Sequence, residues 1–120
     1  RRRATGPNME LQVVETTDDL TVIALTARLD TPGVDRIEIR FNAALGRERS
    51  GVIDLAGVSF LASLGIRMLL TAAKTLARRG AKLILVAPQA LVHEALRFSS
   101  VDELLPVVPD LDSAKQLLAS

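Results

Sequence analysis

The sequence predicts an α/β domain with a mostly parallel sheet of four to five strands, an N-terminal antiparallel hairpin and about four helices. Two observations carry this prediction. From residue 10 onward, short apolar runs alternate with longer segments whose apolar residues recur every three or four positions. Residues 81–87 (AKLILVA) contain a continuous apolar run, which is typical of a strand covered on both faces. We therefore expect helices on the sheet and crossovers that return the strands in parallel.

The first two strands are predicted as a hairpin. Residues 10–16 (ELQVVET) alternate, with Leu11 and Val13 on one side. Asp18 and Asp19 supply a turn, and residues 20–28 (LTVIALTAR) read as the second strand. This close spacing favours an antiparallel pair at one edge of the sheet.

The first helix is predicted from its start and stop signals. Thr31 is expected as the N-cap and Pro32 as the first helical residue, where its missing N–H costs nothing. Gly46 suits the end of the helix. The apolar residues at helical spacing between them are Val34, Ile37, Phe41 and Leu45.

The middle of the chain predicts a strand, a loop and a second helix. Residues 52–55 (VIDL) form the expected strand and residues 56–60 the loop. The helix should begin near Ser63, with Ser63 as N-cap, and end at Gly80. Its expected inward stripe is Ile66, Leu69, Leu70, Ala73, Leu76 and Ala77.

The last third of the chain adds a third helix, a short strand and a fourth helix. Pro88 should open the third helix, whose expected inward residues are Leu91, Val92, Ala95 and Leu96. Residues 104–108 predict a short strand that Pro106 confines to an edge. Asp110 is expected to cap a final helix with an apolar face of Ala114, Leu117 and Leu118.

Composition argues against an enzyme. The 120 residues include no cysteine, which excludes disulfides and thiolate chemistry, and one histidine, which excludes a multi-histidine metal site. No phosphate-binding glycine motif and no GxSxG element occur, and His93 lies within an amphipathic helical pattern. The carboxylate pairs fall at predicted turns, where solvation explains them. We expect no catalytic, cofactor-binding or metal-binding residues.

Charge and hydropathy bear on the cellular location of the protein and on the partners it is expected to bind. The first nine residues hold three arginines and no acid, and we interpret residues 1–9 as a disordered tail or expression remnant and residues 10–119 as the domain. Without those arginines the 15 basic residues fall to 12 against 14 acidic ones. With no Trp or Tyr the chain lacks stacking platforms for single-stranded nucleic acid. No apolar run is long enough to span a membrane. We expect a cytoplasmic protein without direct nucleic-acid binding or membrane insertion.

Residues 52–70 (VIDLAGVSFLASLGIRMLL) carry the most informative pattern. A buried strand ends in Asp-Leu, and a Val-x-Phe segment leads through a serine and a glycine into a helix. This order resembles the STAS domain, the family of the bacterial anti-sigma factor antagonists. The matching positions are Asp54, Leu55, Val58, Ser59, Phe60, Ser63 and Gly65, flanked by residues 28–30, 80–86 and 101–105. The resemblance covers residues 10–118 and implies a STAS-like fold.

By this resemblance the chain is a regulatory binding module. Family members bind an anti-sigma factor that is often a serine kinase, and phosphorylation of the serine at the start of the second helix breaks the complex. A serine phosphatase restores it. Carried over by position, that serine is Ser63, and Asp30 lies in the neighbouring partner surface. Ala62 stands where the family commonly has Asp, and Leu64 replaces a small residue, so this surface is more apolar than usual.

Two interpretations stay open for these residues. Ser63 as an N-cap would have a purely structural role, whereas a phosphate there would turn a neutral surface anionic at the positive end of a helix. The outer stripe of the second helix is either a solvated face or a docking face for an acidic partner. It consists of Arg67, Thr71, Lys74 and Arg78.

Competing functions follow from the same resemblance. Small STAS proteins also resemble structural subunits of lipid-transport ABC complexes, which bind the ATPase permanently. Some STAS domains are proposed to sense nucleotides, but this chain has no phosphate-binding loop. Fold alone does not choose among these functions.

Overall fold

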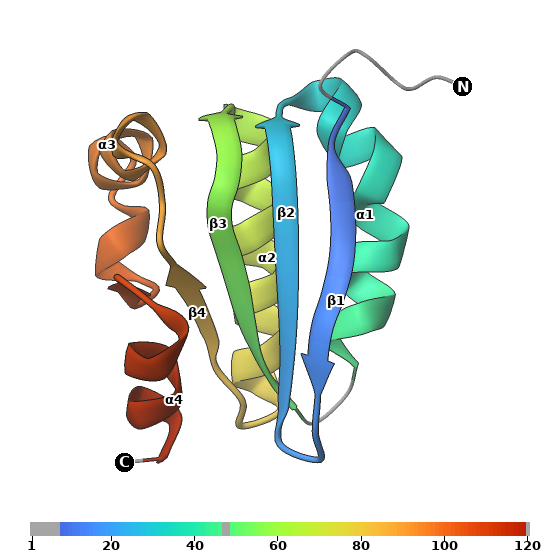
Figure 1. The fold of residues 1–120 in the computed structure, drawn as a ribbon, viewed down its shortest axis with the longest axis vertical. Coiled ribbons are helices and arrows are strands. Elements are labelled where there is room, and N and C mark those ends of the chain that lie inside the picture. The colour runs from blue at the N-terminus through green and yellow to red at the C-terminus, as the bar shows by residue number, and fades with distance from the viewer. Residues whose placement is uncertain (1–7, 47–48, 120) are drawn as a thin grey trace.

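Five strands form one sheet in the order in which they occur along the chain, β1-β2-β3-β4-β5 (Figure 1). This computed structural model describes residues 8–46 and 49–119. The strands are β1 (Glu10–Thr16), β2 (Leu20–Leu29), β3 (Ser50–Leu61), β4 (Leu83–Val86) and β5 (Val107–Val108). β1 pairs antiparallel with β2, and every other neighbouring pair is parallel. The predicted mixed sheet and its N-terminal hairpin are confirmed.

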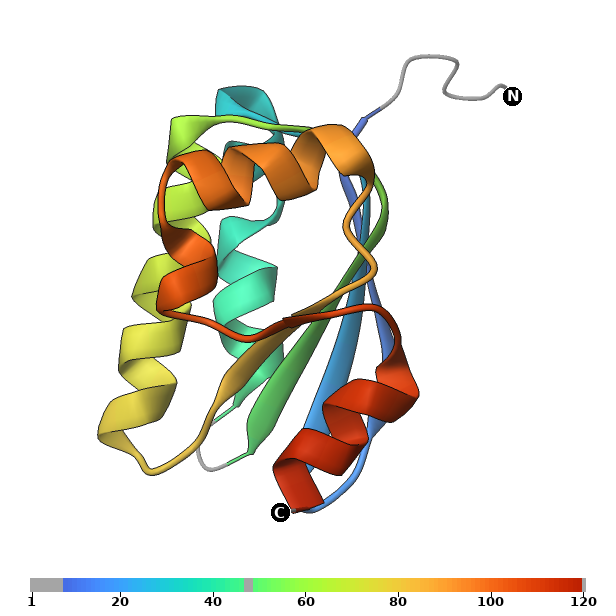
Figure 2. The ribbon, with the colours of Figure 1, turned by 90° about the vertical axis from the view of Figure 1, so that its left-hand side faces the viewer.

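Helices cover both faces of the sheet. The helices are α1 (Thr31–Leu45), α2 (Ser63–Arg78), α3 (Ala90–Phe98) and α4 (Leu111–Ala119), with a short 3-10 turn at Val101–Glu103. Figure 2 shows α1 and α2 on one face, α4 on the other, and α3 across the end where the parallel strands finish. The four predicted helices are therefore present.

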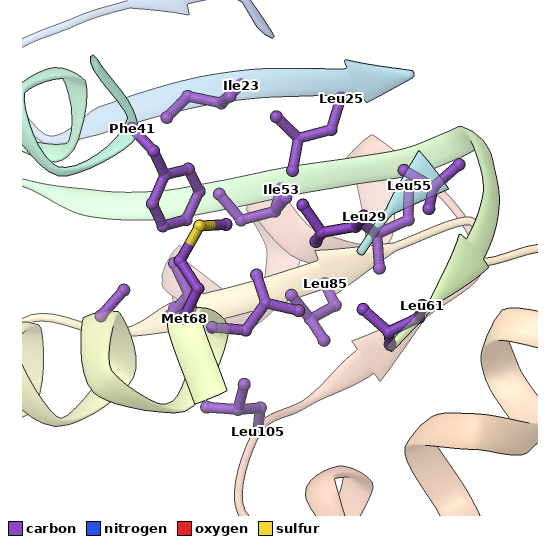
Figure 3. Close-up of a cluster of buried hydrophobic side chains, with 14 of the residues drawn as sticks. Ile23, Leu25, Leu29, Phe41, Ile53, Leu55, Leu61, Met68, Leu85 and Leu105 are labelled. Carbon is purple, nitrogen blue, oxygen red and sulfur yellow. The ribbon is translucent and has the colours of Figure 1, made fainter. Parts of the chain in front are cut away.

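Two hydrophobic cores result from this arrangement. The larger one lies between the sheet and helices α1, α2 and α3 (Figure 3). Alternate residues of the parallel strands point the other way, into a smaller core beneath α4. That smaller core consists of Leu20, Val22, Val52, Ile84, Val86 and Ala114. Because both faces are covered, β4 is buried at every position.

Only the last two residues of the predicted tail, residues 8 and 9, belong to the part of the chain that the structure describes. Residues 1–7 of the predicted tail lie outside the described residues. Met9 is buried at 2% exposure, and its carbonyl oxygen accepts a hydrogen bond of 2.9 Å from Nε of Arg36 on α1. The core thus includes a residue that the sequence placed in the tail.

Strand β3 is much longer than its predicted core of residues 52–55. The predicted loop at residues 56–60 instead continues β3, because residues 57–61 pair in parallel with residues 26–29 of β2. Val58 and Leu61 from this extension are buried in the larger core. At the sheet edge opposite β1, strands β4 and β5 are shorter than predicted. The 3-10 turn occupies part of the chain before β5.

Helix α2 is rotated relative to its predicted inward face. Leu69 and Leu76 are buried as predicted, whereas Ile66, Leu70 and Ala73 are only partly buried against the larger core. Ala77 is exposed. The buried residues of the helix are Gly65, Met68, Leu69, Ala72 and Leu76. The reason is Gly65, where an added Cβ would lie 2.6 Å from the carbonyl oxygen of Leu29. This close approach turns the stripe that contains Gly65 inward and leaves Leu70 on the flank.

The two C-terminal helices bury less than predicted. On α3 only Val92 and Leu96 are fully buried, and Leu91, expected inward, is 61% exposed. On α4 Ala114 is buried as predicted, but Leu117 is 39% exposed. α3 lies across the end of the parallel strands and α4 is the helix on the second face of the sheet (Figure 2). Each of them contacts a core through a narrower side than the sequence pattern indicates.

Candidate functional site

The site residues gather at the end of the sheet where β2 and β3 finish. The backbone N–H of Ala62 donates a hydrogen bond of 3.0 Å to the carbonyl oxygen of Leu29. The residues that follow these two, Ser63 and Asp30, therefore lie at the same end of the sheet, where α1 and α2 begin (Figure 1). Ligand and partner sites commonly form at this end of parallel strands.

Asp30 caps helix α1. Its backbone is extended, and its carboxylate accepts a hydrogen bond of 3.0 Å from the backbone N–H of Gly33. Thr31, the predicted N-cap, is instead the first residue of the helix. An aspartate reaches the third N–H of a helix well, which makes it one of the best N-caps. Asp30 therefore has a structural role at the start of α1, besides the partner-binding role that the resemblance implies.

The same contacts keep Asp30 ionised. The hydrogen bond from the Gly33 N–H holds the pKa of the Asp30 carboxyl below its usual value, and the Arg28 guanidinium lowers it further. Nε of Arg28 lies 3.1 Å from Oδ2 of Asp30, and 25% of the Asp30 side chain stays exposed. This end of the sheet thus presents a permanent, partly neutralised negative charge at neutral pH.

Helix α2, in contrast, begins without a side-chain cap. Its N-cap is Ala62, whose backbone is extended and whose methyl group accepts no hydrogen bond. Ser63, predicted as the N-cap, is the first helical residue and is exposed. The capping role expected for its hydroxyl is therefore wrong. The positive end of the helix dipole therefore has no side-chain acceptor, and it lies next to an exposed serine.

Two glycines bring the helix starts close to β2. An added Cβ at Gly65 would collide with the backbone and side chain of Leu29, and one at Gly33 would collide with the carbonyl oxygen of Arg28. Both are the third residue of their helix. The two N-termini consequently pack against consecutive residues at the end of β2, Gly33 against Arg28 and Asp30 and Gly65 against Leu29, and this packing fixes their spacing.

The structure adds two residues that the sequence analysis did not single out for this site. The guanidinium carbon of Arg28 lies 4.3 Å from the centre of the Phe60 ring, within the range of a cation–π interaction. Arg28 and Phe60 are register partners on β2 and β3. Through Arg28, the cap of α1 is joined to the segment that leads into α2. No simple sequence signal reveals this pair, because two register shifts between β2 and β3 come before it.

The remaining predicted residues extend away from this end. Leu64 is partly buried beside Ser63, whereas Arg67 is exposed one turn further along α2. Lys74 is also exposed, but 11 residues of helix place it about 16 Å from Ser63 along the axis. The basic stripe is therefore solvent-facing, as predicted, and only its first member, Arg67, lies near the serine.

The described residues hold no cluster that points to other chemistry. Within residues 8–46 and 49–119, no three His, Asp or Glu side chains are grouped to hold a metal ion. No helix in this part of the chain is long and apolar enough to cross a membrane. The arrangement instead suits recognition, since it combines exposed polar groups, one charged carboxylate and small apolar side chains.

Comparison with known proteins defines the family. The model of the STAS domain matches residues 12–114. The chain belongs to the STAS domain family. This confirms the resemblance drawn from the order of residues 52–70. Comparison with the sequences of curated proteins found no match.

Several solved structures share the fold of this STAS domain. An anti-sigma factor antagonist from Mycobacterium paratuberculosis is 23% identical with a TM-score of 0.84, over 94% of this chain and 96% of that one. An anti-sigma-factor antagonist (STAS) domain protein from Planctomyces limnophilus is 24% identical with a TM-score of 0.79, over 94% and 99%. The murine anion transporter Solute Carrier 26 family member A9 is 19% identical with a TM-score of 0.73, over 93% of this chain but 22% of the transporter. These likenesses establish the STAS fold.

Proposed function

We propose that this STAS domain is an anti-sigma factor antagonist that acts in the cytoplasm as a binding module, not as an enzyme. It binds an anti-sigma factor that is also a serine kinase, and phosphorylation of Ser63 switches binding off until a serine phosphatase removes the phosphate. The observation that carries the proposal is the exposed Ser63 on the first turn of an uncapped helix, beside the ionised Asp30. Similarity in fold to proteins described as anti-sigma factor antagonists supports it.

The charges at the sheet end explain how a phosphate would act. Phosphorylation adds about −1.5 to −2 charges at neutral pH. On Ser63 this charge meets free N–H groups of α2, which favour it, so the domain stays folded. A partner that packs against Ser63 and Leu64 would have to desolvate the phosphate next to the Asp30 carboxylate. A penalty of about 3 kcal/mol would weaken binding roughly a hundredfold.

The proposed docking surface consists of Asp30, Ala62, Ser63, Leu64, Arg67 and Lys74. Ala62 and Leu64 offer apolar contact at its centre, and the cations of α2 extend it along one helix. Such a surface fits a partner with an apolar patch and an acidic margin, since charges at a rim steer association more than they add affinity. Ala62 replaces an acid, which removes one negative charge that a phosphate would otherwise meet.

A second candidate is a STAS domain that serves a transporter. The shared fold with part of an anion transporter favours it, and a subunit of a lipid-transport ABC complex is a related possibility. In either case the domain would stay bound to its transporter and Ser63 would not need to be modified. Affinity capture from a lysate of the source cell separates the candidates. We expect an anti-sigma factor with a kinase domain; recovery of a transporter or its ATPase instead would favour the second candidate.

Phosphorylation is tested directly with the captured kinase and ATP, followed by mapping of the phosphate by mass spectrometry. We expect modification of Ser63, and none in Ser63→Ala. Ser63→Ala should bind the partner like the wild type, whereas Ser63→Glu should weaken binding by about tenfold, because one carboxylate carries less charge than a phosphate. Ser113→Glu places the same charge on α4, on the opposite face, and should leave binding unchanged. Phosphate on another residue would contradict the switch.

A further inference from the structure

An apolar groove lies beside the proposed docking surface, between α3 and the end of β3. It has a volume of about 370 Å³. Its lining residues are Phe60, Leu61, Leu91, Glu94, Ala95 and Phe98. Phe98 is 96% exposed and Leu91 is 61% exposed, so large apolar side chains rise on the α3 side of the groove. Neighbouring exposed apolar residues of this size commonly mark an interaction site.

The groove is continuous with the Ser63 region. Phe60 forms part of its wall and also carries the guanidinium of Arg28, which pairs with Asp30. Leu61, the next lining residue, is two positions before Ser63. A partner that contacts Asp30 and Ser63 therefore meets the groove at the same end of the sheet.

The shape and charge of the groove select its occupant. On α3 the exposed apolar residues are spaced by seven positions, with Ala95 between them, as on the contact stripe of an amphipathic helix. Glu94 is the single ionisable side chain in the lining, and no described residue forms an ion pair with it. A carboxylate at the rim of an apolar groove favours a basic residue on the occupant.

A second copy of the chain fits this groove poorly. Two α3 helices packed antiparallel about a two-fold axis would place Leu91 of one opposite Phe98 of the other. Glu94 would then lie on the same flank of the contact in both copies, since an isologous contact repeats each residue symmetrically. Opposed carboxylates disfavour that contact, whereas a helix that carries a lysine or arginine at this point would complete it.

We propose that the groove binds an amphipathic helix of the anti-sigma partner, with leucine-sized side chains in the groove and a basic residue against Glu94. This proposal rests on the proposed function and identifies a second contact region next to Ser63. Phe98 is its principal anchor, because a large aromatic side chain that becomes buried on binding is a common hot spot.

The groove itself is tested with two synthetic peptides and ¹⁵N-labelled protein by NMR titration. Both peptides are helical, with leucines at positions i, i+4 and i+7, and they differ only in a lysine or a glutamate on the flank that would face Glu94. We expect saturable shifts in α3 and at residues 60–61, with the lysine peptide binding at least threefold more tightly. Glu94→Gln should abolish that difference. Absence of saturable shifts there, or equal binding of both peptides to the wild type, would overturn the proposal.

The full partner is tested by titration calorimetry with point variants. Phe98→Ala should weaken binding about tenfold, and Glu94→Lys should weaken it as well. Ile39→Ala removes an equally prominent side chain from α1 (86% exposed) and should have no effect. Binding that responds to Ser63→Glu but not to Phe98→Ala would refute the groove and keep the switch. Loss of a wild-type dimer in Phe98→Ala, measured by sedimentation, would assign the groove to a second copy and overturn the proposal.

Discussion

Ala27 and Asp30 show how single residues set the geometry next to Ser63. Ala27 has a φ of 80°, in the left-handed region that a side chain disfavours. It lies where the pairing of β2 with β3 shifts by one residue, immediately before Arg28 pairs with Phe60. Asp30 then caps α1 and binds Arg28. The strained residue Ala27 thus comes directly before Arg28 and Asp30, whose contacts connect β2 to β3 and to the start of α1.

Replacement of Ala27 by glycine should relieve this strain. We expect Ala27→Gly to raise the free energy of unfolding by up to about 1 kcal/mol, because the strain relieved exceeds the added entropy of the unfolded chain. Urea denaturation measures the change. Ala24→Gly, on the same strand without a positive φ, is the control and should destabilise the protein. A loss of stability in Ala27→Gly would contradict a strained backbone at this position.

Asp30 should make the free energy of unfolding fall at acidic pH. Its pKa is lowered in the folded state, so the stabilisation is complete at neutral pH and is lost as pH falls below about 4, through the folded pKa. Asp30→Asn retains an N-cap but not the charge, and its deficit should be below about 1 kcal/mol because the ion pair is partly exposed. Urea melts of both proteins at pH 7 and pH 3 give that deficit at each pH. A deficit that does not shrink in acid would refute the assignment.

Among the elements, those with an unbroken pattern were predicted well. The bounds of β1 and α1 were predicted, and so was the start of α2 near Ser63. Within β1 a register shift follows Val13, which is 45% exposed instead of sharing a buried side with Leu11. The extension of β3 was missed because two register shifts between β2 and β3 interrupt the alternation of inward residues. The same shifts hid the Arg28–Phe60 pair. The inward face of α2 was predicted in part: Leu69 and Leu76 are buried, but Gly65, Met68 and Ala72 were missed. Apolar residues occur on several sides of this helix, and the close approach at Gly65, which sets its rotation, leaves no apolar signal in the sequence.

The uncapped start of α2 allows a sharp test at this scale. Ala62 already has the extended backbone of an N-cap but lacks an acceptor. We expect Ala62→Asp to raise the free energy of unfolding by about 1 kcal/mol, as an aspartate cap does relative to alanine. Thermal or urea denaturation measures this change in the free energy of unfolding. Ala62→Leu is the control, because it also enlarges the side chain but adds no hydrogen-bond acceptor. If both variants behave alike, the N-terminus of α2 is satisfied in another way.

At the scale of the whole molecule, the two cores differ greatly in size. The larger core joins three helices to the sheet, whereas α4 is held by a few side chains, of which Ala114 is the fully buried one on the helix. The proposed binding surfaces lie at the opposite end of the sheet from the free end of α4 (Figure 1). Events at α4 should therefore be separable from binding.

Native-state hydrogen exchange should reveal this difference. We expect amides of β2 and β3 to exchange only through global unfolding, and those of α4 to exchange through local opening at lower free energy. Ala114→Asp, which buries a charge beneath α4, should accelerate exchange in α4 more than in β3. Uniform acceleration across the chain would mean that both cores unfold as one unit.

The close packing of Gly33 and Gly65 against residues 28–30 has a consequence for evolution and engineering. The spacing of the two helix starts depends on the approach of both glycines to the carbonyl groups of Arg28 and Leu29 and to the buried Leu29 side chain, which exchange of outward-facing side chains leaves intact. Ser63 and Arg67 can therefore change identity without a rearrangement of the frame beneath them. Gene duplicates could diverge at such positions into insulated pairs, each copy with its own cognate protein. A library randomised there, with both glycines retained, is a practical source of orthogonal signalling modules.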